Sequence, residues 1–494
     1  MSLVSTLALM STLSTLAAAE DRGDGGDVTL AASSVQYVEA RHSETVVRGR
    51  PWVPHKRVAT IAKGTRLVVR GEVESRDKEG CHGKVWYAVM PFGYVCSEHV
   101  RETKDGPEVG LALPLKPGRR LPHAYALVRR DGAPLYATVE DIELGTVSRE
   151  LTKGMSLVAS HTADVGGATY VQLDSGGLVP KDDVGWMGQG SAWQGVNLDV
   201  GSEPGPVFAW VRADSADVYA EPDKTATKVD QLTLRTRVPL LASDVETEHP
   251  LWWRIGEDRW VLADELNEVH VKAPPTGVLT EFRTESTGND QWIDVDVGEQ
   301  VLVAYRGQTP VYATLVSSGR GSPTPLGNYP IWAKVASMDM ANQDYEDKAY
   351  MVQGVPWVLL FQGHNALHGA YWHDKFGNRK SHGCVNLAPH DARWVFEWAG
   401  PALPKGWTGY LPTDLDKSVV VHVRDSSRGP GRTFTQQRPI GPPDREEERR
   451  KAEEAEERRA LADADEAGAA EIGAGEAPVD RRPPRIQPPN EFSN

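Results

Sequence analysis

One stretch of the chain, residues 368–386 with the sequence HGAYWHDKFGNRKSHGCVN, brings a cysteine and several histidines close together. A cysteine thiolate is a strong nucleophile once a nearby base or cation helps the thiol to lose its proton, and histidine is the usual partner. Gly383 directly precedes Cys384, so the backbone can turn sharply there and point N–H groups at an oxyanion. The other interpretation is a buried apolar cysteine beside a structural histidine. The flanking glycines favour nucleophilic catalysis.

His368 is the histidine that the neighbouring elements can bring to the cysteine. An apolar run at residues 355–361 comes before it, and it lies 16 residues before Cys384. A strand ending at His368, an excursion, and a loop presenting residues 381–384 would let the two side chains meet. The remaining nearby histidines are expected at the surface or behind the reacting groups, and these are His364, His373 and His390.

The surrounding sequence predicts a mainly β fold. Short runs rich in β-branched and aromatic residues suit β-strands at residues 292–297, 300–305 and 311–316, and residues 418–423 suit a closing strand. Residues 389–399 predict a short helix after the cysteine, because proline suits the first helical turn and Asp391 lies near the positive end of the helix dipole.

Two ordered motifs resemble those of the L,D-transpeptidase catalytic domain family of bacterial cell-wall enzymes. The first is His368-Gly369 followed by Ser381-His382-Gly383-Cys384-Val385-Asn386, and the second is TPLGNYPI at residues 324–331, which is similar to the TPxGxF/Y segment of the family. The resemblance covers roughly residues 292–424. Many family members carry Arg where this chain has Asn386, and this departure concerns the acceptor side of the reaction.

The resemblance implies a role for each matching residue. Cys384 would attack the amide between an L-centre and a D-amino acid of a peptidoglycan stem peptide, release D-alanine, and transfer the acyl group to an acceptor amine. That amine would belong to a second stem peptide, giving a cross-link, or to an envelope protein. His368 would be the proton donor and acceptor. The supporting residues are the Gly369 carbonyl orienting His368, the Gly383 N–H in the oxyanion hole, and Ser381, His382, Asn386 and Tyr329 in the loop or substrate contacts.

Several alternatives remain open from the sequence. The same thioester would serve an L,D-carboxypeptidase or endopeptidase, and a wall-binding scaffold without catalysis is a third possibility. A papain-like endopeptidase fits less well, because in those enzymes the cysteine comes before the histidine. Zinc ligation by Cys384 with His368, His373 and His382 lacks the regular ligand pairs of zinc sites, so we expect no metal and no cofactor.

A weak repeat lies in front of the catalytic region. The closing valines of three similar segments are Val95, Val179 and Val261, which are 84 and 82 residues apart. This period predicts a small domain repeated three times, with the strand pattern of small antiparallel barrels. The segments resemble bacterial Src-homology-3-like domains, modules often found beside cell-wall enzymes. They would bind the wall, position the catalytic domain, or act as spacers.

Composition bounds the location and the partners. The formal net charge of −15 argues against nucleic acid as a partner, and no internal run of about 18 apolar residues predicts a membrane span. Residues 3–16 are apolar and end in Ala17-Ala18-Ala19, which predicts a secretory signal and a place in the periplasm or cell envelope, although no basic residue precedes the run. Cys81 and Cys96 would either form a disulfide across a hairpin or stay unpaired.

Together these features predict eight segments. They are a signal peptide (1–19), a flexible leader (20–36), three Src-homology-3-like segments (37–105, 120–190 and 205–270), a linker (271–290), the catalytic domain (291–424) and a disordered charged, Pro-rich tail (425–494).

Overall fold

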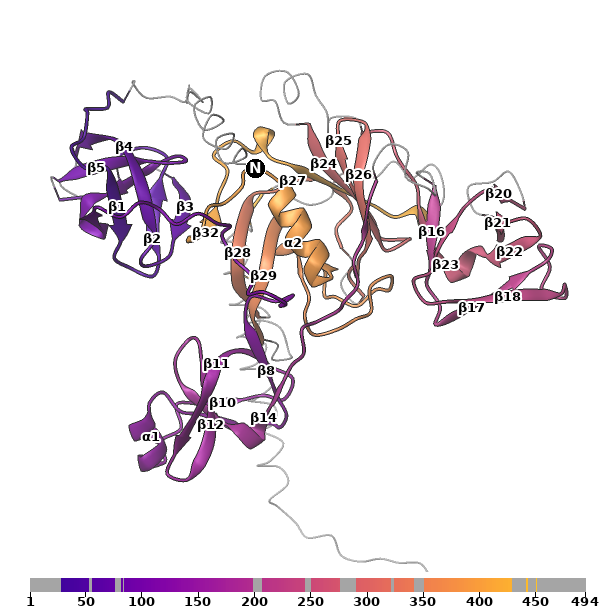
Figure 1. The fold of residues 1–494 in the computed structure, drawn as a ribbon, viewed down its shortest axis with the longest axis horizontal. Coiled ribbons are helices and arrows are strands. Elements are labelled where there is room, and N and C mark those ends of the chain that lie inside the picture. The colour runs from indigo at the N-terminus through magenta and orange to yellow at the C-terminus, as the bar shows by residue number, and fades with distance from the viewer. Residues whose placement is uncertain are drawn as a thin grey trace, which may run out of the picture. The chain divides into compact units, whose positions relative to one another are not determined.

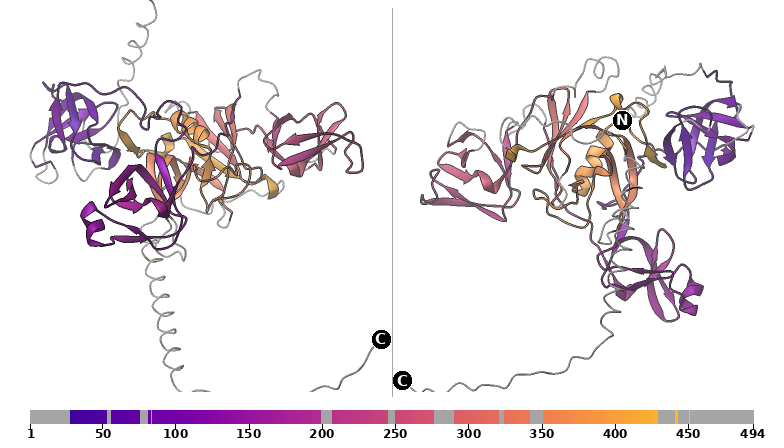
Figure 2. Two further views of the ribbon diagram at one scale, coloured as in Figure 1. Left: turned by 60° about the horizontal axis from the view of Figure 1, so that its bottom comes forward. Right: turned by 180° about the vertical axis from the view of Figure 1, so that it is seen from behind.

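A computed structural model of the protein describes residues 28–52, 56–75, 81–82, 84–198, 207–244, 250–275, 290–320, 324–341, 351–428, 441–442 and 450. The predicted signal peptide, most of the linker and most of the tail lie outside these residues. Strands dominate the described chain (Figures 1 and 2), which confirms the predicted mainly β class. No helix in the described ranges is long and apolar enough to cross a membrane.

The chain divides into two compact units, residues 1–108 and 109–494, which are described separately. The described part of the first unit holds seven strands: β1 (Tyr37–Ala40), β2 (Thr45–Arg48), β3 (Arg57–Ile61), β4 (Arg66–Glu74), β5 (Val85–Val89), β6 (Tyr94–Cys96) and β7 (Val100–Thr103). Antiparallel pairings join them in the order β3, β2, β6, β5, β4, β1, β7. These pairings leave the run open, so closure into a barrel stays a prediction. Cys81 and Cys96 form a disulfide.

Two further β modules begin the second unit. The second repeat contains β8 (Ala124–Val128), β9 (Ala133–Leu135), α1 (Val139–Leu144), β10 (Arg149–Leu151), β11 (Ser156–Val165), β12 (Ala168–Leu173), β13 (Leu178–Pro180) and β14 (Val184–Trp186). The third contains β16 (Phe208–Val211), β17 (Ser215–Tyr219), β18 (Lys228–Thr233), β19 (Arg237–Pro239), β20 (Ala242–Ser243), β21 (Trp252–Gly256), β22 (Arg259–Leu262) and β23 (Leu266–Val269). Each has a buried apolar cluster. The helix α1 was not expected from the repeat pattern.

The predicted catalytic region combines two β layers. One is a six-stranded sheet in the order β15 (Val196–Asn197), β26 (Thr309–Leu315), β25 (Val301–Arg306), β24 (Gln291–Asp296), β33 (Val420–Arg424), β27 (Gly327–Pro330). The other pairs β32 (Trp407–Tyr410), β28 (Ala333–Ala341), β29 (Met351–Gln362), β30 (Asn365–Gly369) and β31 (Val385–Leu387) in that order. The helix α2 (Pro389–Trp398) packs against β29 and β30. The strands and the helix predicted around the cysteine are confirmed within two residues.

Asp391 fixes the start of α2. The carboxylate is fully buried and accepts hydrogen bonds from the Tyr312 hydroxyl at 2.6 Å, the Thr314 hydroxyl at 2.5 Å and the Gly195 N–H at 2.9 Å. A carboxylate near a helix N-terminus is also favoured by the helix dipole. The helix that follows the cysteine is therefore joined both to β26 and to the segment between the second and third repeats.

Lys334 fixes the other end of α2. It lies on β28 with 2% of its surface exposed, and its Nζ donates to the carbonyls of Phe396 at 2.6 Å, Ala399 at 2.5 Å and Pro401 at 2.9 Å. Burial lowers the pKa of Lys334 to about 7, and Glu397 opposes this shift. Because only the ammonium has three N–H donors, the three bonds require the charged form.

Replacing this lysine tests how much the helix end depends on it. Lys334→Met keeps the aliphatic length but leaves three buried carbonyls without their donor, so we expect the free energy of unfolding to fall by about 3 kcal/mol. Urea unfolding followed by tryptophan fluorescence measures the change. The control is Lys116→Met on an exposed side chain, which should change stability by less than about 0.5 kcal/mol. Equal midpoints for both variants would contradict the role given to Lys334.

Candidate active site

The predicted nucleophile and base lie at a parallel pair of short strands. In the pairing of β30 with β31, Leu367 lies opposite Val385 and His368 lies opposite Asn386. Cys384 directly precedes β31, and the N–H of Ala366 donates to its sulfur. Residues two apart on a strand share a face, so His368 and Cys384 lie on the same side of the pair.

The environment of Cys384 keeps it as a thiol at neutral pH. The side chain is partly exposed, but the protein atoms packed around the sulfur desolvate it and raise its pKa to about 11, while the N–H of Ala366 acts in the opposite direction. The thiol points to the carbonyl oxygen of His364, with Sγ and that oxygen 3.7 Å apart. Removing the thiol proton therefore needs a base.

His368 has the form that a general base requires. It is 1% exposed, and its Nδ1 lies 3.3 Å from the carbonyl oxygen of Gly369. Because a carbonyl only accepts, Nδ1 carries the proton and the lone pair is on Nε2. Burial lowers the pKa of His368 to about 4, the bond to Gly369 raises it, and His373 lowers it. The predicted Gly369 contact is present, and the ring is neutral at pH 7.

The turn before Cys384 is held by internal hydrogen bonds. The Ser381 hydroxyl donates to the Cys384 carbonyl and accepts the N–H of Gly383 at 3.1 Å. Gly383 has a φ of +143°, which favours glycine. The sequence analysis expected the Gly383 N–H to face an oxyanion. In the conformation observed it does not, because this N–H is already donated to the Ser381 hydroxyl.

Thr324 is a supporting residue whose role the sequence analysis missed. It is 3% exposed, and its hydroxyl donates to the Gly383 carbonyl at 2.8 Å and accepts the N–H of Gly319 at 3.0 Å. The first residue of the TPLGNYPI motif therefore fixes the turn that carries the cysteine. The signal was the motif itself, but nothing in the sequence indicated which distant carbonyl the threonine would bond.

The other predicted site residues differ in burial and in hydrogen-bond partners. Asn386 is 2% exposed, and its side-chain nitrogen lies 2.9 Å from Nε2 of His373. Tyr329 is fully buried and donates to the Leu326 carbonyl at 2.8 Å, so it stabilises the motif loop from within. His382 is exposed at the turn.

His373 is partly buried and hydrogen-bonded to residues near the site. Its Nδ1 accepts the N–H of Lys375 at 3.2 Å, and its Nε2 lies beside Asn386. Burial lowers the pKa of His373 to about 4, Lys380 lowers it further, and Asp374 raises it. The ring is thus neutral at pH 7 and is hydrogen-bonded to Asn386, the residue opposite His368.

The second repeat contributes to the surroundings of Cys384. Tyr125 and Tyr371 stack with ring centroids 3.6 Å apart, and both belong to a buried cluster against which Cys384 packs. The Tyr125 hydroxyl donates to the carbonyl of Gly354 at 2.8 Å. Gly354 has a φ of +58°, and a Cβ there would lie 2.3 Å from Val158, so only glycine allows this approach. The sequence analysis had predicted the second repeat as a segment separate from the catalytic domain.

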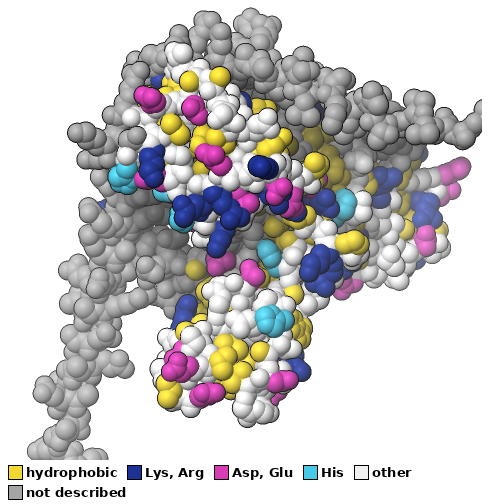
Figure 3. Space-filling view, turned by 60° about the vertical axis from the view of Figure 1, so that its left-hand side comes forward, with side chains coloured by type: hydrophobic (Ala, Val, Ile, Leu, Met, Phe, Trp, Pro, Cys, Tyr) yellow, Lys and Arg dark blue, Asp and Glu magenta, His cyan; other side chains and the backbone are white. Residues whose placement is uncertain are grey.

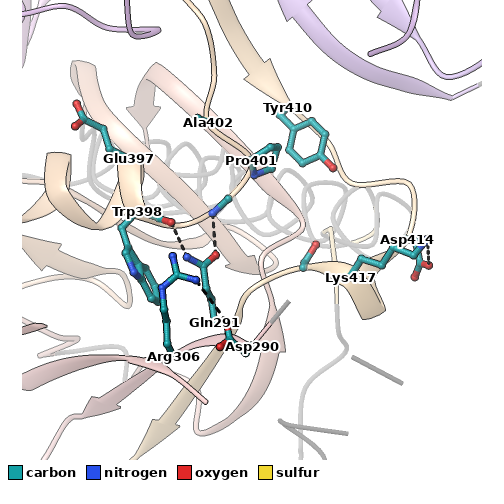
Figure 4. A pocket seen from close by; sticks show the side chains of 12 residues that line it. Asp290, Gln291, Arg306, Glu397, Trp398, Pro401, Ala402, Tyr410, Asp414 and Lys417 are labelled. Carbon is teal, nitrogen blue, oxygen red and sulfur yellow. Dashed lines mark hydrogen bonds and ion pairs between the residues drawn. The ribbon is translucent and has the colours of Figure 1, made fainter. Parts of the chain in front are cut away.

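Two further observations concern places away from Cys384 and His368. No group of three or more His, Cys, Asp or Glu residues could hold a metal ion within the described ranges. A cavity of about 440 Å³ (Figure 4) is lined by residues at the far end of α2 and at the β24–β25 edge, among them Gln291, Arg306, Trp398 and Lys417, and neither Cys384 nor His368 lines it. On the face in Figure 3, basic, acidic and apolar side chains are interspersed.

Part of the chain is similar in sequence to known proteins. Residues 290–421 match the family model YkuD, the L,D-transpeptidase catalytic domain. A protein of Bacillus subtilis (strain 168) named "Putative L,D-transpeptidase YciB" is 28% identical over 120 residues, which are 22% of this chain and 59% of the relative. The chain thus covers less than two thirds of the length of that relative.

Solved structures with some similarity include two L,D-transpeptidases. A mutant of the Enterococcus faecium L,D-transpeptidase is 22% identical, with 28% of this chain and 50% of that chain covered and a TM-score of 0.22. L,D-transpeptidase 3 from Mycobacterium tuberculosis is 17% identical, with 27% and 61% covered and a TM-score of 0.22. Among these comparisons, the match of residues 290–421 to the model of the L,D-transpeptidase catalytic domain concerns the region that contains His368 and Cys384.

Proposed function

We propose that the chain is an exported peptidoglycan L,D-transpeptidase with Cys384 as nucleophile and His368 as proton donor and acceptor. The observation that carries this proposal is the β30–β31 pair, which places a thiol and a neutral, Nε2-basic imidazole on one face of adjacent strands. The match of residues 290–421 to the family model supports the choice of peptidoglycan stem peptides as substrate.

The two neutral groups define the order of proton transfers. Sγ of Cys384 forms a bond to the carbonyl carbon between the L-centre and the D-amino acid, and its proton passes to Nε2 of His368. His368 then gives this proton to the amine nitrogen as the amide bond breaks, so D-alanine leaves and a thioester remains. An acceptor amine attacks the thioester, gives a proton to His368, and Cys384 leaves as the thiol. Each proton taken up is returned.

The oxyanion requires donors that the resting turn supplies only in part. The Cys384 N–H is the first donor in this proposal. The Gly383 N–H joins it if the bond to Ser381 opens when substrate binds, and one such donor typically lowers the barrier by about 3 kcal/mol. Ser381 then changes from an acceptor of this N–H to a group that only holds the Cys384 carbonyl.

The acceptor decides between the related reactions. Attack by an amine gives a cross-link or attaches a protein, whereas attack by water gives a carboxypeptidase or endopeptidase product from the same thioester. Asn386, which stands where many relatives have Arg, is hydrogen-bonded to His373 and lies opposite His368. The acceptor side of the site is therefore where this chain departs from the family pattern.

Intact-protein mass measurement with a tetrapeptide stem tests the proposal. The wild type should gain the mass of the stem minus D-alanine, and an added acceptor amine should remove this adduct as a cross-linked product. Cys384→Ala should form no adduct, and His368→Ala should form it at least about a hundredfold more slowly because the base is missing. Because Cys81 and Cys96 are bonded to each other, Cys384 is the free thiol in the protein.

The other outcomes of this experiment separate the alternatives. Free tripeptide accumulating without cross-linked product would identify a carboxypeptidase. No turnover of any stem peptide by the wild type would favour the scaffold.

The pH dependence of thiol alkylation tests the resting protonation state. Because the pKa of Cys384 is raised to about 11, the thiolate fraction and the rate of reaction with iodoacetamide should rise about tenfold per pH unit from pH 7 to 10. The pKa of His368 is lowered to about 4, so this residue stays neutral throughout that range. The unfolded protein in urea is the control, and its rate should level off near pH 9. A rate that is constant between pH 5 and 9 would instead indicate a preformed thiolate–imidazolium pair.

A further inference from the structure

The loop that joins His368 to Cys384 has little regular structure of its own. It runs from residue 370 to residue 384, and within it only Ser381 pairs as an isolated bridge. The catalytic region holds it in part, through the Ser317 hydroxyl to the Lys375 carbonyl at 2.8 Å and the Gly377 N–H to the Val316 carbonyl at 2.9 Å. These bonds leave the segment around Asp374 to be fixed by other parts of the chain.

The third repeat supplies the missing contacts. Nη2 of Arg235 donates to the Asp374 carboxylate at 2.7 Å and to the Asp374 carbonyl at 3.1 Å. The Ser191 hydroxyl, on the segment that leads into this repeat, donates to the same carboxylate at 2.5 Å. Nδ2 of Asn267 donates to the Gly377 carbonyl at 3.1 Å. Three residues outside the catalytic region thus converge on two neighbouring points of one loop.

The third repeat is locally shaped for these contacts. Arg235 has a φ of +66°, which is uncommon for a residue with a side chain, and its side chain is only 14% exposed with the guanidinium 5.2 Å over the ring of Trp193. Asn267 is fully buried, and Gly377 has a φ of +95° with a Cβ position only 2.7 Å from Asn267 Oδ1. A spacer would need neither the left-handed arginine nor this close approach.

Asp374 is connected to His368 through two intervening residues, His373 and Asn386. Asp374 follows His373, His373 is hydrogen-bonded to Asn386, and Asn386 is paired with His368 across the two strands. Phe376, two residues further on, packs in one buried cluster with Phe208 and Trp210 of the third repeat. A displacement of Asp374 would therefore move His373 and Asn386, and Asn386 shares a face of the β30–β31 pair with His368.

We infer that the third repeat is a positioning module of the active site, in which Arg235 and Asn267 hold the loop between His368 and Cys384 in its reactive conformation. They are positioning residues, because they act through Asp374 and Gly377 and do not touch the reacting atoms. The inference rests on the proposed function for its effect on rate, whereas its effect on the loop is independent of what the enzyme acts on.

Substitutions on the full-length protein separate positioning from folding. Arg235→Met removes the charge and keeps most of the apolar contact with Trp193, Asp374→Asn removes the partner on a side chain that is 56% exposed, and Arg235→Lys keeps the charge. The matched control is Arg259→Met, which breaks the 2.6 Å ion pair with Asp230 on the same module without a contact to the loop.

Two measurements are made on each variant. Hydrogen exchange of peptides covering residues 370–383 should become at least about tenfold faster in Arg235→Met and Asp374→Asn, and stay unchanged in Arg259→Met. The rate of acylation by a saturating tetrapeptide stem should fall about tenfold in the first two variants, with the half-saturating concentration unchanged and partial recovery in Arg235→Lys. The double variant Arg235→Met/Asp374→Asn should show the same exchange and acylation rates as either single variant, because both substitutions remove the same contact.

The outcomes distinguish the two proposals. If the wild type is not acylated by any stem peptide, the proposed function fails, and the exchange rates still test whether the third repeat holds the loop. If loop exchange in Arg235→Met equals that in Arg259→Met, the positioning role is wrong. The same conclusion follows if Asp374→Asn is acylated at the wild-type rate.

Discussion

The parallel pairing of β30 with β31 is the constraint on which the rest of the site depends. Parallel neighbours cannot be joined by a tight turn, and their connection is usually a helix that satisfies its own backbone hydrogen bonds. Here the connection is an irregular loop of residues 370–384. Its backbone groups must find partners elsewhere, and they find them in the segment of residues 316–318 that follows β26, in β31, and in the third repeat. Bringing Cys384 beside His368 therefore involves distant parts of the chain.

Burial favours the neutral form of both Cys384 and His368. It disfavours the thiolate of Cys384 and the imidazolium of His368, so the resting pair is neutral and charge appears only when substrate is attacked. A neutral pair protects the free thiol, because the thiolate is the form that reacts with oxidants and electrophiles. In the proposed reaction, His368 must therefore take the thiol proton in the first step, so the orientation of its ring by the Gly369 carbonyl would affect the rate as well as the fold.

The sequence predicted those features that depend on local pattern. Residue types at short spacing were enough to predict the strands β24, β25 and β26 and the helix α2 with proline at its first position. The order of His368 before Cys384 is likewise visible in the sequence itself. It could not predict contacts between residues far apart, such as Arg235 with Asp374 or Thr324 with Gly383, because neither residue type nor spacing specifies a partner 139 or 59 residues away. The hydrogen bond from the Gly383 N–H to the Ser381 hydroxyl could not be predicted either, because it depends on a side-chain rotamer that the sequence does not determine.

A shared repeat pattern does not imply a shared role. The first repeat has its own buried centre with the Cys81–Cys96 disulfide and forms a separate compact unit, whereas the second and third belong to the unit of the catalytic region. The second places Tyr125 and Val158 in the cluster beside Cys384, and the third places Phe208 and Trp210 in the cluster behind the six-stranded sheet. Burying these side chains in a common core gives each later repeat a fixed orientation, which a flexible wall-binding module does not need.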